Sequence, residues 1–121
     1  MGARSSRSDR SNVARGRWGE DLAASHYRRN GYTILARNWR GSSGELDLIL
    51  ERDGTIVFSE VKARRSARHG SPAWAVGPDK QRRIRRLAVE WLQATSTPRR
   101  SLRFDVVTIT GIELRVIEAA F

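Results

Sequence analysis

Two neighbouring apolar segments constrain the fold of this chain more than any other feature. Residues 46–50 and 56–61 are nearly continuous in apolar side chains, and they flank Asp53-Gly54, a pair typical of a tight hairpin turn. Nearly continuous apolar strands are typical of sheets that are covered by helices on both faces. The sequence therefore predicts an α/β fold in which a mixed sheet lies between two helical layers, a three-layer α/β/α sandwich.

Two helices are predicted from their periodicity. The first covers residues 11–30 and has a narrow stripe of mostly small side chains, which lets a helix approach a sheet closely. The second begins at Lys80-Gln81 and has a strong apolar stripe. The first stripe consists of Gly16, Gly19, Glu20, Ala23 and Tyr27, and the second consists of Ile84, Leu87, Ala88, Trp91 and Leu92.

Turn residues and β-rich runs complete the predicted order of elements. Strands are expected over residues 32–38, 45–51, 55–63, 102–110 and 112–117. The order is thus helix, three strands, helix, two strands. The tryptophans Trp18, Trp39 and Trp91 are expected in or near the core, and Asp105, within an apolar strand, is expected to be hydrogen-bonded.

The chain is expected to form one domain with a short tail. Its 121 residues are enough for a substantial core without disulfides or other cross-links. Residues 1–10 are dominated by Ser and Arg without periodicity and predict a disordered basic tail, so the single domain covers residues 11–121. Residues 64–78 lack a clear period and predict a long basic loop of the kind that usually binds a ligand.

The charge of the chain indicates its class of partner. Its 23 basic and 13 acidic residues leave a formal net charge of +10, which attracts polyanions. Nucleic acid is the expected partner, with an anionic membrane surface as the weaker alternative. No segment is long and apolar enough for a membrane helix or a secretion signal, so the cytoplasm is the expected location. The absence of cysteine excludes disulfides, zinc–thiolate sites and cysteine nucleophiles.

The basic residues are unevenly divided between two types. Only Lys62 and Lys80 are lysines, and the other 21 are arginines. Lysine offers a compact ammonium whose pKa changes readily on burial, whereas the guanidinium stays charged and planar. Chance is the alternative explanation, but the two positions are candidates for a function that arginine does not provide.

The two central strands predict a cluster of acids with a lysine. Because side chains alternate along a strand, Glu45 and Asp47 are expected on one face, opposite Leu46, Leu48 and Leu50. The same alternation puts Glu60 and Lys62 together on the next strand. Neighbouring buried acids repel each other unless a cation lies between them. Oxygen ligands without His or Cys favour Mg²⁺ or Mn²⁺, and a site of this kind indicates phosphodiester hydrolysis.

The motifs of the chain resemble those of a known superfamily. Residues 44–49, GELDLI, and 57–62, VFSEVK, resemble the active-site signature of the PD-(D/E)xK nucleases, which have a restriction-endonuclease-like fold. Further motifs are similar to those of the YraN-like family of small bacterial proteins, which are related to archaeal Holliday-junction resolvases. These motifs are Gly19-Glu20, Asn38 with Arg40, Lys80-Gln81 and residues 103–107, RFDVV.

The resemblance implies roles for four residues. Asp47 and Glu60 would be metal ligands, Lys62 the catalytic lysine and Glu20 an auxiliary acid from the first helix. Structural alternatives remain open for all four. Glu20 also suits the positive end of a helix dipole, and the other three also suit a structural ion-pair cluster. Glu45 is either a further metal contact or a surface acid paired with arginine.

Several basic and polar residues are candidates for binding nucleic acid. Lys80 and Gln81 begin the second helix, where backbone N–H groups favour phosphate, although plain capping competes evenly. The other candidates lie on the second helix, in the long loop and before the second strand, where arginines suit phosphate contacts. The complete set is Lys80, Gln81, Arg82, Arg85, Arg64, Arg65, Arg68 and Arg40.

Three functions are compatible with these features. The first is a metal-dependent endonuclease that acts on branched or structured DNA. The second is a DNA-binding module that retains the nuclease fold without catalysis, and the third is a basic RNA- or ribosome-associated protein. A junction-resolving enzyme would need a two-fold homodimer to cut symmetrically.

Overall fold

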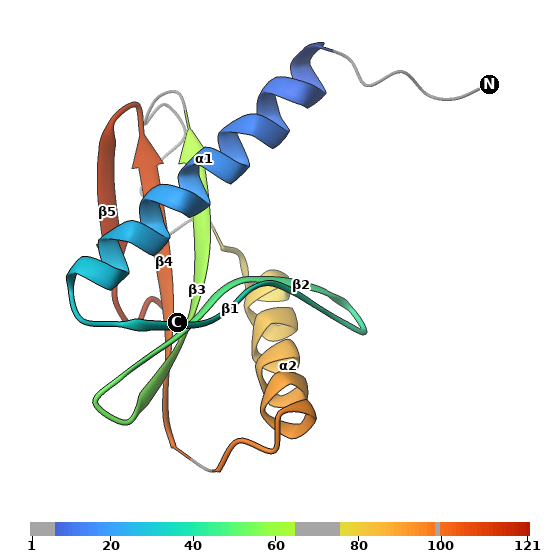
Figure 1. The fold of residues 1–121 in the computed structure, drawn as a ribbon. Helices are drawn as coiled ribbons and strands as arrows, with labels where there is room; N and C mark the ends of the chain where they lie inside the picture. Colours follow the sequence, from blue (N-terminus) through green and yellow to red (C-terminus); the bar gives the residue numbers. More distant parts are fainter. Residues whose placement is uncertain (1–6, 65–75, 99) are drawn as a thin grey trace.

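The computed structural model describes residues 7–64, 76–98 and 100–121 (Figure 1). Within these ranges two helices and five strands follow one another in the predicted order. They are α1 (Arg7–Arg29), β1 (Thr33–Gly41), β2 (Gly44–Arg52), β3 (Thr55–Arg64), α2 (Pro78–Ala94), β4 (Ser101–Thr110) and β5 (Glu113–Ile117). The largest difference in boundaries is at α1, which begins at Arg7 and not near Ser11.

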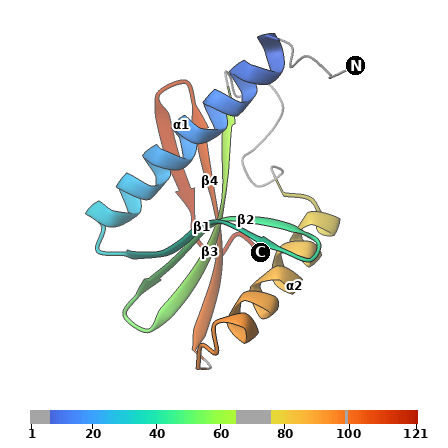
Figure 2. The same ribbon diagram turned by 45° about the vertical axis from the view of Figure 1, so that its right-hand side comes forward.

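The five strands form one mixed sheet in the order β1-β2-β3-β4-β5. Only β3 and β4 are parallel, and the other neighbours are antiparallel. A parallel pair needs a crossover connection, which α2 provides between β3 and β4. Because α1 and α2 lie on opposite faces of the sheet (Figures 1 and 2), the predicted α/β/α sandwich is confirmed.

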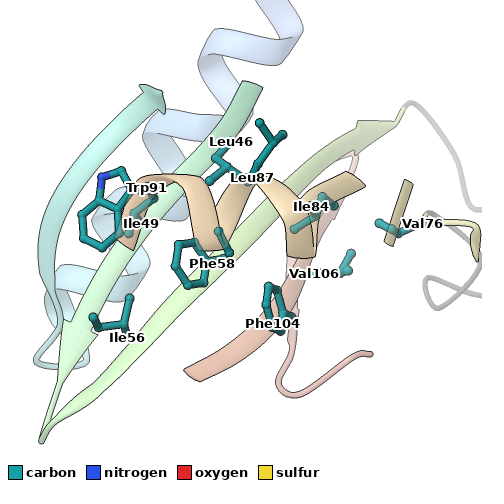
Figure 3. Close-up of a cluster of buried hydrophobic side chains, with 11 residues drawn as sticks. Leu46, Ile49, Ile56, Phe58, Val76, Ile84, Leu87, Trp91, Phe104 and Val106 are labelled. Atoms are coloured by element: carbon teal, nitrogen blue, oxygen red, sulfur yellow. The ribbon is translucent and has the colours of Figure 1, made fainter. Parts of the chain in front are cut away.

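Each helix covers a separate core. The α2 side buries Ile84, Leu87 and Trp91 against side chains of β2, β3 and β4 (Figure 3). Phe58 lies at its centre, with its ring 5.9 Å from that of Trp91 in an edge-to-face arrangement. The α1 side buries Ala23, Ala24, Tyr27, Tyr32, Leu48, Leu50, Val57, Val107 and Ile109. The two cores explain why the central strands are apolar on both faces.

Helix α1 approaches the sheet through its small residues. A Cβ atom on Gly19 would lie 3.0 Å from Cβ of Ala63 on β3, whereas one on Gly16 would have no neighbour within 4 Å. The amino-terminal turns of α1 extend beyond the sheet (Figures 1 and 2). Trp18 accordingly has 44% of its surface exposed, and its predicted place near the core is wrong.

A buried polar network connects α1 to the centre of the sheet. Tyr27 donates a hydrogen bond from its hydroxyl to Oδ2 of Asp105 (2.9 Å), and its oxygen lies 2.9 Å from Oγ of Ser59. Arg103 donates from Nε and Nη2 to the two carboxylate oxygens of Asp105, at 2.8 Å each. The expected structural role of Asp105 is confirmed, and the network holds Ser59 immediately before Glu60.

Neither α1 nor α2, the two helices in the described part of the chain, is both long and apolar enough to cross a membrane.

Candidate active site between β2 and β3

Regular pairing between β2 and β3 ends where the two predicted metal ligands stand. The last regular pair at this end of the ladder is Leu48 with Ser59, so Asp47 and Glu60 are the next residues on each strand. Each carboxylate accepts a hydrogen bond from the opposite strand. The N–H of Val61 donates to Oδ2 of Asp47 (2.8 Å), and the N–H of Asp47 donates to Oε1 of Glu60 (3.5 Å). The structure therefore brings both carboxylates together.

The predicted alternation of side chains breaks at the same place. Leu46 packs in the α2-side core together with Ile49, whereas Leu48 and Leu50 pack in the α1-side core. The prediction that Leu46, Leu48 and Leu50 share one face is therefore wrong. An irregularity of this kind re-aims side chains, and irregular strand segments are frequent next to active sites. Here Asp47 stands at the irregularity itself.

Burial makes the carboxylates difficult to ionise together. Glu60 is only 4% exposed, and burial together with the charge of Asp47 raises its pKa to about 7. Burial is also the main cause that raises the pKa of Asp47. Two acids that lose water and repel each other are stable as anions only beside positive charge. A cation is therefore the natural complement of this pair.

Both lysines of the chain lie at this pair. Lys80 on α2 places Nζ 3.5 Å from Oε2 of Glu60. Lys62 lies two residues beyond Glu60 on β3, and its pKa is lowered chiefly by the charge of Lys80 and then by burial. The sequence indicated a phosphate contact or a capping role for Lys80, and did not predict its ion pair with Glu60.

A second group of acids flanks Asp47 on the α1 side. The side-chain amide of Asn38 donates to Oε1 of Glu20 (2.8 Å) and to Oε1 of Glu45 (3.0 Å). Burial raises the pKa of Glu20, and the charge of Asp47 adds to this rise. Nη2 of Arg37 lies 3.9 Å from Oε1 of Glu20, and its charge partly offsets this rise in the pKa of Glu20.

Asn38 is a functional candidate that sequence reasoning noted only as part of a motif. Its φ angle of 51° is in the left-handed region, which asparagine tolerates better than most residues. No periodicity in the sequence indicates this backbone geometry. Only the structure shows the left-handed conformation of Asn38 within β1, so the sequence alone did not indicate that Asn38 connects Glu20 and Glu45.

Two of the candidate arginines, Arg40 and Arg82, have acidic partners. Nη2 of Arg40 lies 3.2 Å from Oε2 of Glu45. This ion pair agrees with the alternative in which Glu45 is a surface acid paired with arginine. Arg82 pairs with Asp79 in the first turn of α2. Arg64 ends β3, and its charge contributes to the lowered pKa of Lys62.

Two candidates on α2 have structural contacts. The guanidinium of Arg85 lies 4.7 Å from the ring centre of Phe104 and 5.5 Å from that of Phe121. The side-chain amide of Gln81 donates to the carbonyl of Val76 (3.0 Å) and so fixes the chain that enters α2. Arg65 and Arg68 lie outside the described residues, as does most of the predicted loop over residues 64–78.

Known proteins similar to this chain identify its family. The uncharacterised protein family UPF0102 matches residues 19–109. The chain belongs to this family. A UPF0102 protein of Rhodococcus opacus is 52% identical over 98 residues, which cover 81% of this chain and 83% of the relative. A UPF0102 protein of Syntrophus aciditrophicus is 42% identical over 114 residues, which cover 91% and 90% of the two chains. The resemblance to the YraN-like family is thereby confirmed.

The UPF0102 match contains every acid and lysine of the site. Glu20, Asp47, Glu60, Lys62 and Lys80 all lie within residues 19–109. Most of the part of α1 that extends beyond the sheet precedes this range. The names of these two relatives state no activity.

The donor set of this UPF0102 protein suits a hard divalent cation. Asp47 and Glu60 offer only oxygen atoms, and Mg²⁺ is commonly held by one or two carboxylates with water and substrate phosphate. Within residues 7–64, 76–98 and 100–121, no three His, Asp or Glu side chains gather closely enough to bind a metal ion by themselves. The two-carboxylate arrangement therefore fits a cation that is shared with a phosphate group.

Proposed function

We propose that this UPF0102 protein hydrolyses phosphodiester bonds of nucleic acid with the help of a divalent cation. The observation that carries the proposal is the buried pair of Asp47 and Glu60 at the break between β2 and β3, with both lysines of the chain beside it. Burying two acids side by side costs stability unless a positive partner is present. Strongly perturbed acids of this kind cluster at functional sites.

The residues of the site have distinct proposed roles. Asp47 and Glu60 would hold Mg²⁺ or Mn²⁺, which polarises a phosphoryl oxygen and lowers the pKa of a bound water. Lys62, two residues from Glu60 on the same strand, suits stabilisation of the charge that grows on the phosphate. Glu20, oriented by the amide of Asn38, suits an auxiliary acid beside Asp47.

The proposed substrate is DNA with a branched or otherwise structured backbone. The net charge of +10 supports binding to a polyanion through its phosphates and without sequence readout. The arginines of α2 and the basic residues around β3 would supply the phosphate contacts. The branched shape rests on the resemblance to junction resolvases, which would also require a two-fold homodimer.

A cleavage assay over substrates and metals tests the proposal. Four-way, flap and linear DNA and a structured RNA are incubated with the protein in Mg²⁺, Mn²⁺ or EDTA. We expect metal-dependent cleavage of branched DNA that Asp47→Asn abolishes. Asp53→Asn is the matched control, because Asp53 stands in the β2–β3 turn with 93% of its side chain exposed, and should cleave normally.

Three results would overturn the proposal in whole or in part. Binding of DNA without cleavage under every metal condition would identify a binding module with a nuclease fold. Cleavage that is confined to RNA would exclude DNA as the substrate. Loss of DNA binding in Asp47→Asn to the same extent as loss of cleavage would exclude a catalytic role of Asp47.

A further inference from the structure

Lys80 occupies a place where a divalent cation would compete with it. Glu60 has two carboxylate oxygens with separate partners: Oε1 accepts from the backbone of Asp47, and Oε2 faces the ammonium of Lys80 at 3.5 Å. A cation bound to this carboxylate would stand beside the ammonium, and two positive charges at one buried oxygen repel each other. The ion pair and the metal therefore compete for Glu60.

The structure lets the side chain of Lys80 move while its backbone stays in place. The first two turns of α2 are fixed by the hydrogen bond from the Gln81 side-chain amide to the Val76 carbonyl and by the buried side chain of Ile84. Lys80 itself has 32% of its side chain exposed, so its ammonium has access to water and to an approaching ligand. The four-carbon stem of lysine is flexible enough for such a movement.

The rarity of lysine in the chain supports a specific requirement at this position. Lys80 is paired with Glu60 and Lys62 lies two residues from Glu60 on β3, whereas arginine occupies the other 21 basic positions. An arginine at position 80 would present a planar fork that binds carboxylates with two parallel hydrogen bonds. A partner that must later be released is better provided by a single ammonium.

We propose that Lys80 is an exchangeable counter-ion, which neutralises Glu60 in the absence of metal and moves to the substrate phosphate when a divalent cation takes Glu60. This inference rests on the proposed function and adds a second lysine to its site. In the free protein Lys80 stabilises the buried carboxylate. In the substrate complex it is a further donor to the phosphate, beside Lys62.

The small number of lysines makes the exchange directly observable. Protein labelled with ¹³C at lysine Cε has only two such signals, which Lys80→Met assigns. Titration with Mg²⁺ alone should shift the Lys80 signal, and its saturation should follow the metal binding that calorimetry measures. A Lys80 signal that stays unchanged while Mg²⁺ binds would overturn the exchange but leave the proposed function intact. Absence of binding by both Mg²⁺ and Mn²⁺ would overturn both.

The variant Lys80→Met provides a second test. Removal of the competing ammonium should tighten Mg²⁺ binding by at least about fivefold, the lower range of typical coupling between sites. It should also lower Tm in EDTA and leave Tm near that of the unaltered protein at saturating Mg²⁺. A purely structural lysine would lower Tm equally in both conditions, and that result would contradict the proposal.

Two further variants separate the effect of Lys80 from a general effect of charge. Arg86→Met removes one exposed positive charge from the same helix, away from Glu60, and should change Mg²⁺ affinity much less than Lys80→Met. Equal changes in the two variants would show only a general charge effect and would overturn the proposal. Lys80→Arg keeps the charge if Lys80→Met does not fold. It should weaken Mg²⁺ binding, because the guanidinium fork holds the carboxylate more firmly, and an unchanged or tighter affinity would again overturn the proposal.

Discussion

At the scale of single residues, Glu60 is the most informative side chain of the site. Its ordinary pKa of 4.5 is raised to about 7 in the folded protein, chiefly by burial. Between these two pH values the folded state keeps a proton that the unfolded state has lost. The contribution of Glu60 to the free energy of unfolding therefore falls as the pH rises from 4.5 to about 7, and this contribution is constant at higher pH.

This titration predicts the behaviour of Glu60→Gln in EDTA. The amide does not ionise, so the variant should gain stability relative to the unaltered protein as pH rises from 4.5 to about 7. The relative gain is on the order of 2 to 3 kcal/mol, as expected for a shift of this size. Urea unfolding of both proteins across this range measures it. Parallel stability profiles would show that Glu60 is not a strained acid in the metal-free protein.

Tyr27 tests whether the buried network is structural. Its hydroxyl contacts both Ser59 and Asp105, and burial strongly raises its pKa, so it stays protonated as a donor at neutral pH. Tyr27→Phe keeps the ring but leaves these two polar groups short of a partner, which costs about 1 to 3 kcal/mol. Denaturant unfolding would measure the loss. An unchanged midpoint would show that the network contributes little.

At the scale of elements, two glycines of α1 predict opposite effects for the same substitution. Gly16→Ala should stabilise the protein by up to about 1 kcal/mol, because its Cβ meets nothing within 4 Å and alanine favours a helix. Gly19→Ala should destabilise it, since its Cβ would lie 3.0 Å from that of Ala63, which is attached directly to the β3 backbone. Thermal unfolding compares the two variants. Equal stabilisation by both would contradict the close approach of α1 to the sheet.

Most elements were predictable because local patterns determine them. The apolar stripe of α2, the Asp53-Gly54 turn and the apolar runs of β2 and β3 each indicate one element, and the structure contains all of them. The start of α1 was predicted too late, since residues 7–10 contain no apolar side chain and therefore no apolar stripe that would indicate a helix. The break at Asp47 was missed because strict alternation along a strand contains no signal for an irregularity.

At the scale of the whole molecule, the site depends on contacts between distant segments. Asp47, Glu60 and Lys62 were predictable because a motif on two consecutive strands carries them. The ion pair of Lys80 with Glu60 was not predictable from the sequence, because it depends on where the first turn of α2 lies relative to β3. The bridge from Asn38 to Glu20 likewise joins α1 to β1 through tertiary packing.

The net charge of +10 predicts a strong dependence of DNA binding on salt. The logarithm of the affinity should fall linearly with the logarithm of the salt concentration, with a slope of about −0.9 for each phosphate contact. Arg82→Ala should make this slope less steep by about 0.9, the value of one phosphate contact. Arg85→Ala should reduce the stability of the fold in addition to the slope, because the Arg85 guanidinium lies over the ring of Phe104. Fluorescence anisotropy over a salt series measures the slope, and an unchanged slope in Arg82→Ala would remove Arg82 from the binding surface.

If the proposed function is correct, Asp47 and Glu60 together hold a divalent cation. The most direct measurement is a crystal structure of the metal-free protein after a soak in Mn²⁺, with anomalous data collected for manganese. We expect an anomalous peak within coordination distance of both carboxylates, with the ammonium of Lys80 moved away from Glu60. An intact Lys80–Glu60 ion pair and no peak at Asp47, in crystals that bind Mn²⁺ elsewhere, would show that these two carboxylates do not form a metal site.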